Sequence, residues 1–442
     1  MAYFQKKGLT VAPFKVGPDF IDPGHHTRIT GTISRNLDGW MLTREYNEDC
    51  FRRHAASADI AIVEGVMGLF DGYSGTSEEG STAQMAKWNN LPVILVVNAQ
   101  SMARSAAAIV QGFENFDPDL KFAGVIFNKV GSDRHLAYLT EAMEGNSGIP
   151  VLGGIFRDEE IEIPERHLGL VTNDEHILSA EAIDKLAGLI EANIDIAKLL
   201  DNVKEYMAPE PYAGNDAKSE IQKEHRVKIG VARDQAFCFY YKDNIEILES
   251  FGAEIVYFSP MEDSKLPDGI NGIYFGGGYP ELFAKKLSDN KSLLEEIKAF
   301  SETNMPLYGE CGGFMYLCND IRDHDGDTYK MTGCLPFSLR MLNKLKTLGY
   351  REVVIKKDSV LGETGHRVRG HEFHYSEIIN TDEKAETVYS VQKRVFNSSV
   401  EEGYTNGNTL GSYIHLHFGS NLNTAENFVA SCRRWMLSDN VV

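Results

Sequence analysis

Short apolar runs alternate with longer stretches of helical periodicity through the first part of the chain. Runs that are apolar on both faces are typical of buried strands in a parallel sheet, and the amphipathic stretches between them fit the crossover helices that such a sheet needs. The pattern therefore predicts an α/β domain over residues 1–207. Its expected strands are Leu9–Lys15, Asp59–Val63, Pro92–Asn98 and Phe122–Asn128.

A polar segment interrupts this pattern after the first domain. Ala208–Glu224 is rich in Pro, Gly, Asn and Lys, which is typical of a linker, so we assign residues 208–225 to a connection between domains. A second α/β domain is predicted over residues 226–442. Its apolar runs are Val227–Ala232, Glu254–Ser259, Gly272–Phe275 and Met305–Gly309.

Composition and charge narrow the class of protein. The 442 residues are 43% hydrophobic and 24% charged, as in an ordinary globular enzyme. A formal net charge of −20 would repel both nucleic acids and anionic membrane surfaces. The six cysteines are too sparse for a disulfide framework, and no apolar stretch approaches the length of a membrane span. We therefore expect a cytoplasmic protein with no nucleic-acid partner and no membrane partner.

Cys311 lies where an apolar run ends and a helix-like pattern begins, within Gly309-Glu-Cys-Gly-Gly313. The glycines permit a sharp strand-to-helix turn, and the start of the helix would favour a thiolate. A lone cysteine after a strand is more often a small buried hydrophobe. Two further segments in the right order favour the catalytic interpretation of Cys311.

The first of these segments is the glycine turn after the expected strand at 272–275. The amides of Gly277 and Gly278, together with that of Gly312, can bind an oxyanion. The second segment, Gly411–Gly419, supplies His415 as the base.

Together the three segments resemble the glutaminase domain of class I glutamine amidotransferases. The resemblance implies that the cysteine attacks the side-chain amide of glutamine, that ammonia leaves, and that water hydrolyses the thioester. Many members place a glutamate two residues after the histidine, whereas this chain has His417. It is therefore similar to the cobyric and cobyrinic acid branch, which works with a Cys–His pair.

Acidic residues follow two of the expected strands in the first domain. Asp19 and Asp22 lie in a loop braced by Pro and Gly, Glu64 ends an apolar run, and Asp71 lies in the loop after it. Asp beside Pro or Gly is also ordinary turn chemistry. Glu64 is harder to dismiss, because an acid at the end of a buried strand needs a cation or hydrogen-bond donors. Carboxylates grouped in this way suit Mg²⁺ and the phosphates that it carries.

Six motifs in order extend the resemblance over nearly the whole chain. They are similar to motifs of the cobyrinic acid a,c-diamide synthases, whose synthetase domain resembles dethiobiotin synthetase, a P-loop fold. The motifs are Lys15–His26, Ser34–Asp38, Val63–Gly72, Gly124–Lys129, Pro164–Leu170 and Arg369–Ser376.

This family resemblance implies amidation of two acetate side chains of a corrin precursor, with glutamine and ATP as further substrates and Mg²⁺ as cofactor. It makes Asp19, Asp22, Glu64 and Asp71 residues for nucleotide, metal or substrate, with Glu64 and Asp19 at the metal. The resemblance is also compatible with a homodimer.

One expected motif is absent from this sequence. A P-loop needs Gly-x-x-x-x-Gly-Lys-[Ser/Thr] after its first strand, and the chain contains no Gly-Lys pair. Met1–Gly8 is typical of the last turns of the helix that follows such a loop. We expect a truncated or mis-started chain that lacks roughly 20–30 residues and is a poor ATPase as it stands.

Two alternatives remain open at the level of sequence. Ni-sirohydrochlorin a,c-diamide synthases share the architecture and nearly all of these motifs, and spacing does not separate the two macrocycles. A catalytically silent binding or regulatory protein is the other alternative, and the intact elbow and His415 argue against it. The histidines His366, His371 and His374 lack the spacing of a zinc site, so we expect hydrogen-bonding or substrate roles for them.

Overall fold

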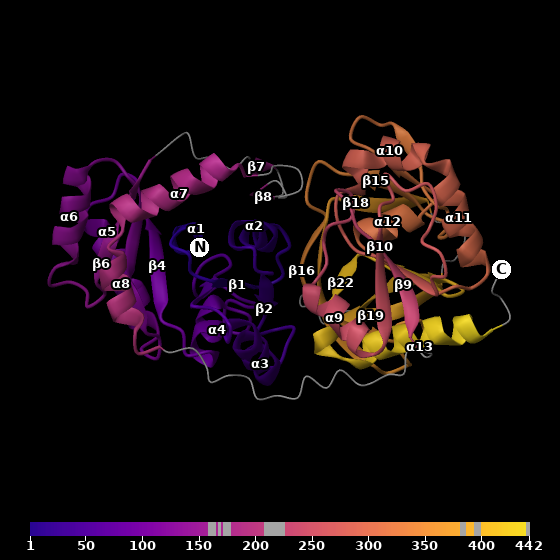
Figure 1. Ribbon diagram of the computed structural model, residues 1–442, viewed down its shortest axis with the longest axis horizontal. Coiled ribbons are helices and arrows are strands. Elements are labelled where there is room, and N and C mark those ends of the chain that lie inside the picture. The colour runs from indigo at the N-terminus through magenta and orange to yellow at the C-terminus, as the bar shows by residue number, and fades with distance from the viewer. Residues whose placement is uncertain are drawn as a thin grey trace. The chain divides into compact units, whose positions relative to one another are not determined.

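The chain forms two compact units, Met1–Gly214 and Asn215–Val442 (Figure 1). The computed structural model describes residues 1–157, 165–166, 169–170, 178–206, 226–380, 386–392 and 399–438. The predicted linker over 208–225 lies outside the described residues, as do Pro164, His167 and Leu168 of the fifth motif.

Unit 1 contains parallel strands, as predicted, but they form two three-stranded sheets instead of one. The first has the order β2-β1-β3 and the second the order β4-β5-β6, both parallel throughout. Within the described residues, β3 and β4 each pair with a single strand. The bounds are β1 Val11–Val16, β2 Arg35–Leu37, β3 Ile60–Glu64, β4 Val93–Asn98, β5 Phe122–Val130 and β6 Val151–Phe156.

Side-chain caps explain where most of the unit 1 helices begin. Ser, Thr or Asp at the N-cap accepts a backbone amide from the first turn in α3, α4, α6, α7 and α8. A two-residue antiparallel pair, β7 Glu165–Arg166 with β8 Gly169–Leu170, completes the unit. The helices are α1 Ala2–Lys6, α2 Ile21–Thr30, α3 Arg44–Ala55, α4 Thr82–Trp88, α5 Arg104–Phe116, α6 Asp133–Met143, α7 Ala180–Asn193 and α8 Ile196–Val203.

Unit 2 is built on a ten-stranded sheet of order β10-β9-β11-β12-β21-β20-β19-β16-β17-β22. The strands from β10 to β21 in this order are parallel, and those from β21 to β22 are antiparallel. The bounds are β9 Val227–Ala232, β10 Ala253–Phe258, β11 Gly272–Phe275, β12 Leu307–Glu310, β16 Thr347–Ile355, β17 Arg367–His374, β19 Glu386–Gln392, β20 Ser399–Asn406, β21 Thr409–Ser412 and β22 Ile414–Leu416.

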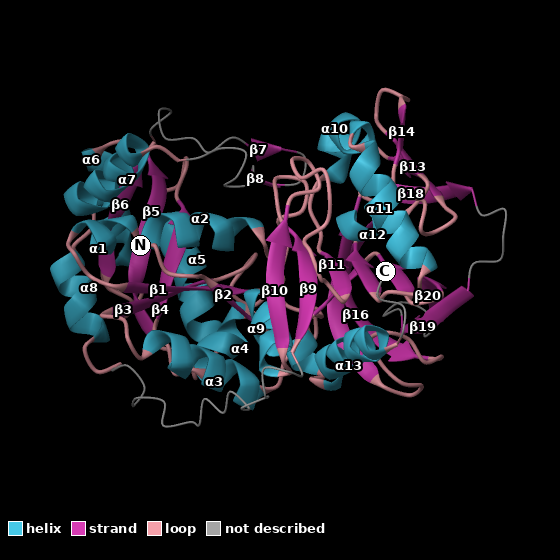
Figure 2. Cartoon of the chain, turned by 45° about the vertical axis from the view of Figure 1, so that its right-hand side comes forward, coloured by secondary structure: helices cyan, strands magenta, loops and turns pink. Residues whose placement is uncertain are grey.

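Helices lie on both faces of this sheet (Figure 2). Alternate residues of β11 separate two cores: Ile273 and Phe275 pack with α10, α11 and α12, whereas Tyr274 packs with α9 and α13. Unit 2 also contains a separate four-stranded sheet, whose strands fall between those of the large sheet in the sequence. Its strands are β13 Asp320–Arg322, β14 Thr328–Lys330, β15 Ser338–Met341 and β18 Ser376–Asn380. The helices are α9 Lys242–Ser250, η2 Pro280–Phe283, α10 Ala284–Asp289, α11 Lys291–Glu302, α12 Gly312–Leu317, η3 Phe418–Ser420 and α13 Asn423–Leu437.

The strands predicted from the apolar runs are all present, with bounds that shift by a residue or two. Each of the described helices falls short of the length and hydrophobicity that crossing a bilayer requires.

Candidate active site

Cys311 occupies the predicted sharp turn between β12 and α12. Its φ of +48° and ψ of −101° lie where non-glycine residues are strained, as is typical of a nucleophile held up from a strand end. The turn needs glycine on both sides: a Cβ on Gly313 would lie 2.2 Å from the carbonyl oxygen of Phe275, and one on Gly309 would lie 2.7 Å from Leu317 Cδ1. The Cys311 amide donates to the Ser412 carbonyl on β21 at 2.7 Å.

The thiol of Cys311 is neutral in the free site. Its sulfur lies 3.7 Å from the carbonyl oxygen of Phe373, and the residue is only 7% exposed. Burial raises the pKa of the thiol, the charge of Glu281 raises it further, and the Gly312 amide lowers it by less. Our expectation that the helix start favours a thiolate is therefore wrong here, because desolvation outweighs the amides of a short helix. The thiol needs a base.

His415, the residue predicted as the base, lies on β22 against the glycine turn. Its ring lies against Gly277, where a Cβ would come within 2.3 Å of His415 Cε1, so only glycine leaves room for it. The ring stacks on His371 at 4.8 Å, and His371 hydrogen-bonds the Tyr241 hydroxyl at 2.9 Å. Burial lowers the pKa of His415 to about 3, so the ring is neutral at physiological pH and can accept a proton.

The glycine turn contributes differently from what we predicted. Gly277 does not supply an oxyanion donor, because its amide donates to the Phe239 carbonyl at 3.1 Å. The amide nitrogen of Gly278 lies 3.0 Å from the place where a Cβ on Gly312 would stand, so these two glycines are neighbours. Gly278 and Gly312 remain the candidates for binding an oxyanion, and Gly277 instead makes room for His415.

The side chain of His417 hydrogen-bonds within its own turn. Its Nδ1 accepts the Gly419 amide at 3.1 Å, which caps η3, and its ring packs on Tyr241 at 4.5 Å. Burial lowers its pKa to about 4. These contacts favour a structural role for His417.

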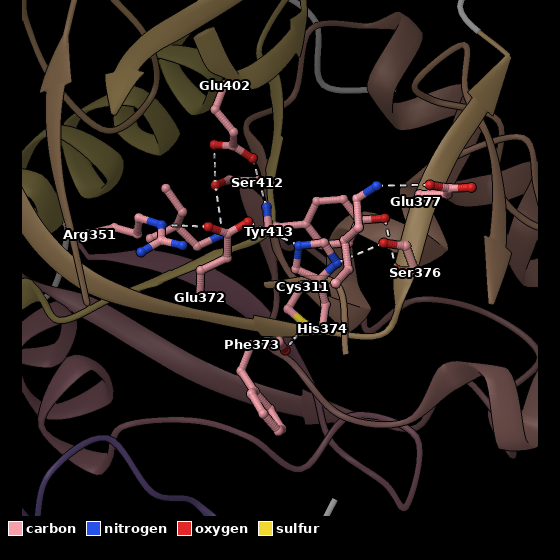
Figure 3. Close-up of polar contacts among 12 residues, drawn as sticks. Cys311, Arg351, Glu372, Phe373, His374, Ser376, Glu377, Glu402, Ser412 and Tyr413 are labelled. Carbon is pink, nitrogen blue, oxygen red and sulfur yellow. Dashed lines mark hydrogen bonds and ion pairs between the residues drawn. The ribbon is translucent and has the colours of Figure 1, made fainter. Parts of the chain in front are cut away.

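Sequence reasoning missed Arg351 and Glu372, which form a row of polar contacts with His374 close to Cys311 (Figure 3). Glu372 Oε2 accepts from Arg351 Nε at 2.6 Å, and Glu372 Oε1 lies 3.0 Å from His374 Nε2. The other ring nitrogen of His374 faces the Ser376 carbonyl at 2.8 Å. The ring of His374 thus links Glu372 to the Ser376 carbonyl. Alternating polar residues along the motif Arg369–Ser376 were the signal for this row.

Hydrogen-bonding roles were predicted for the histidines of this region, and those of His371 and His374 are confirmed. Glu372 acts on the site electrostatically: its charge raises the pKa of both His415 and Cys311. A negative charge here favours the protonated form of His415.

In unit 1, three of the predicted acids converge on a lysine that sequence reasoning missed. The buried ammonium of Lys15 lies 2.5 Å from Asp22 Oδ2, 3.5 Å from Glu64 Oε1 and 3.8 Å from Asp19 Oδ2. Burial opposes the charge of Lys15, but the bond to Asp22 and the other acids raise its pKa overall. Its place at the end of the buried strand β1 was the signal in the sequence.

These acids differ in their surroundings. Burial and the charge of Asp22 raise the pKa of Asp19. Burial is also the largest effect on Asp22, but the bond and charge of Lys15, together with Asp19 and His26, lower its pKa overall. Glu64 Oε2 also lies 2.5 Å from His26 Nε2. Asp71, by contrast, accepts the Gly68 amide at 3.0 Å and closes its own loop. The described contacts join Asp71 to that turn, not to Lys15.

Comparison with known proteins gives matches over both halves of the chain. Residues 228–422 match the CobB/CobQ-like glutamine amidotransferase domain, and residues 1–171 match the CobQ/CobB/MinD/ParA nucleotide binding domain.

Three relatives are each called cobyrinate a,c-diamide synthase. The chain is 44% identical to that of Leptospira interrogans (97% of this chain, 93% of the relative). It is 44% identical to that of Syntrophotalea carbinolica (98% and 94%) and 41% identical to that of Methanobrevibacter smithii (96% and 92%).

Proposed function

We propose, because the chain belongs to the family of cobyrinate a,c-diamide synthases, that it amidates the a and c acetate carboxylates of cobyrinic acid with ammonia taken from glutamine. The enzyme is a glutamine-dependent ligase of cobalamin biosynthesis that uses a nucleotide. The observation that carries the proposal is the presence, in one chain, of a strained cysteine elbow in unit 2 and a converging set of carboxylates in unit 1.

Unit 2 would release the ammonia. His415 takes the proton of Cys311, and the sulfur attacks the amide carbon of glutamine. The amides of the neighbouring Gly278 and Gly312 would donate to the oxygen that becomes negative in the tetrahedral intermediate. The imidazolium of His415 then returns its proton to the departing nitrogen, and ammonia leaves a thioester that water hydrolyses to glutamate.

Unit 1 would prepare the carboxylate. A carboxylate does not react with ammonia at neutral pH, because oxide would have to leave. ATP converts the acid to an acyl phosphate, whose phosphate leaves readily. Ammonia must reach this intermediate unprotonated, which explains why the glutaminase and the synthetase belong to one chain.

The acids around Lys15 fit a magnesium ion. Asp19 and Glu64 offer only oxygen ligands, and both have an oxygen within 3.8 Å of one ammonium group, so their geometry already accommodates a cation. We propose that these two residues hold Mg²⁺, which neutralises charge on the phosphates when bound. Lys15, held in place by Asp22, would then orient the substrate carboxylate.

The substrates are small soluble molecules, and we propose that the enzyme works in the cytoplasm. All six cysteines are free thiols, which suits a reducing compartment. The strongly acidic chain argues against nucleic-acid or membrane partners. A homodimer stays a prediction.

The substrate assignment is tested with the protein extended upstream through a P-loop, because the 442 residues lack that motif and should form little diamide alone. The extended protein, which also serves in the other amidation assays, receives ATP, Mg²⁺, glutamine and either cobyrinic acid or Ni-sirohydrochlorin. We expect mass spectrometry to show the diamide of cobyrinic acid and little product from the nickel macrocycle. Product from Ni-sirohydrochlorin alone would reassign the substrate. Glutamine hydrolysis without amidation of either compound would instead favour a binding or regulatory protein.

Glu64→Gln should impair amidation selectively. The substitution removes the charge and nearly preserves the shape, so we expect ATP-dependent amidation to fall by about tenfold or more and the Mg²⁺ concentration for half-maximal rate to rise. Glutamate release from glutamine should remain. Exposed Glu181 on α7 is the matched control, and Glu181→Gln should change neither activity. Amidation kinetics unchanged in Glu64→Gln would remove Glu64 from the site.

A further inference from the structure

A fully buried carboxylate belongs to the residue that directly precedes the nucleophile in the chain. Glu310, the last residue of β12, is 1% exposed and precedes Cys311 in the chain. Its Oε1 accepts from the Tyr308 hydroxyl at 2.7 Å and from the Leu416 amide at 3.0 Å, and its Oε2 accepts from the Tyr274 hydroxyl at 2.8 Å. A charge in such a place persists only when donors surround it.

The Leu416 bond joins parts of the sheet that do not pair. β12 hydrogen-bonds β11 and β21, whereas β22 hydrogen-bonds β17 at the far end of the strand order. Glu310 is adjacent to Cys311, and Leu416 is adjacent to His415. One carboxylate therefore ties the residue before the nucleophile to the residue after the base.

A second buried acid fixes the segment that leads to the base. Glu402 on β20 accepts from the Ser412 hydroxyl at 2.7 Å and from the Tyr413 amide at 2.8 Å. The Ser412 hydroxyl oxygen in turn accepts the Ile414 amide at 3.0 Å. Figure 3 shows Glu402 above Ser412 and Tyr413. Between β21 and β22 the backbone amides thus bond to side chains, which makes the position of His415 depend on these acids.

We propose that Glu310 is a positioning residue for glutamine hydrolysis, whose carboxylate sets the position of His415 relative to Cys311 by bonding the Leu416 amide. This inference rests on the proposed glutaminase function. Glu310 acts through the two strand ends without touching the substrate. Proton transfer from thiol to imidazole depends steeply on geometry, so loss of the bond lowers the rate of hydrolysis more than the binding of glutamine.

Two variants separate positioning from stability. Glu310→Ala leaves three buried donors without an acceptor, so part of the protein is expected to unfold. Glu310→Gln keeps an oxygen for the Leu416 amide and the Tyr308 hydroxyl, and its amide can donate to the Tyr274 hydroxyl oxygen. Glu295→Ala on the exposed surface of α11 is the control.

The measurement is kcat and KM for glutamate release, expressed per active cysteine. Active sites are counted with a chloroketone analogue of glutamine, which alkylates Cys311 only in folded protein. For Glu310→Ala we expect kcat per site to fall roughly 10²-fold, with KM within about threefold of the wild-type value. For Glu310→Gln we expect kcat per site to be at least about tenfold higher than for Glu310→Ala.

A role confined to stability would lower the number of alkylated sites and leave kcat per site unchanged. Glu310→Ala with wild-type kcat per site would therefore overturn the positioning role alone. Absence of both glutamine hydrolysis and alkylation in the wild-type protein would overturn the glutaminase function itself, and the positioning role with it.

Discussion

Cys311→Ala is expected to abolish amidation from glutamine and to preserve amidation from added ammonium salts. Cys311 is the residue held at the strained turn, with its sulfur beside the Phe373 carbonyl. It belongs to unit 2, whereas the carboxylates around Lys15 belong to unit 1. Removing the sulfur therefore removes only the release of ammonia.

The measurement compares diamide formation with glutamine and with an ammonium salt at a pH that supplies free ammonia. Cys238→Ala provides the control, since Cys238 is a partly exposed thiol in the same unit, and it should retain both activities. Cys311→Ser should behave like the alanine variant, because a hydroxyl is a far weaker nucleophile. Equal loss of both activities in a folded Cys311→Ala protein would contradict this division of labour.

His415→Ala is expected to lose glutamine hydrolysis by a factor on the order of 10²–10⁴, the usual cost of removing a general base. Burial raises the pKa of the Cys311 thiol, so the reaction requires a group that takes its proton. Burial lowers the pKa of His415 to about 3, so the neutral base is present at every pH above that value. The need for His415 should thus persist across the neutral range.

His417→Ala is the matched control on the same short segment. It loses the bond from the Gly419 amide and the packing on Tyr241, which stabilise a turn, so its turnover should fall far less. Glutamate release and thermal unfolding of both variants provide the comparison. Greater loss in His417→Ala at equal stability would show that His417 is the base.

Local patterns predicted the eight strands named from apolar runs and the elbow, but not the strands from β13 to β22. Each apolar run became a strand, and glycines around Cys311 were a reliable sign of the sharp turn. The interpretation of Gly277 was wrong for a non-local reason: its amide bonds Phe239, whose position no local pattern reveals. The thiolate expectation was wrong because desolvation depends on everything packed around the sulfur.

Residues that come together from distant segments were the ones missed. Glu372 reaches the site because β17 pairs with β22. Lys15 meets Glu64 because β1 pairs with β3 in that register, and it meets Asp22 in the first turn of α2, not in a loop as predicted. Lys15 was overlooked because a single lysine in an apolar run is normally assigned to the surface, although its ammonium is buried here.

In the described part of unit 1, β4 forms an edge of its three-stranded sheet. β4 has the sequence Val93-Ile-Leu-Val-Val-Asn98, with no charge or proline, and Ile94 and Val96 are 39% and 61% exposed. Such a strand edge is a template for cross-β stacking, which natural proteins usually block with lysine or proline. Where β4 is such an edge, a charge introduced at Val96 should oppose the addition of a further strand and reduce association through it.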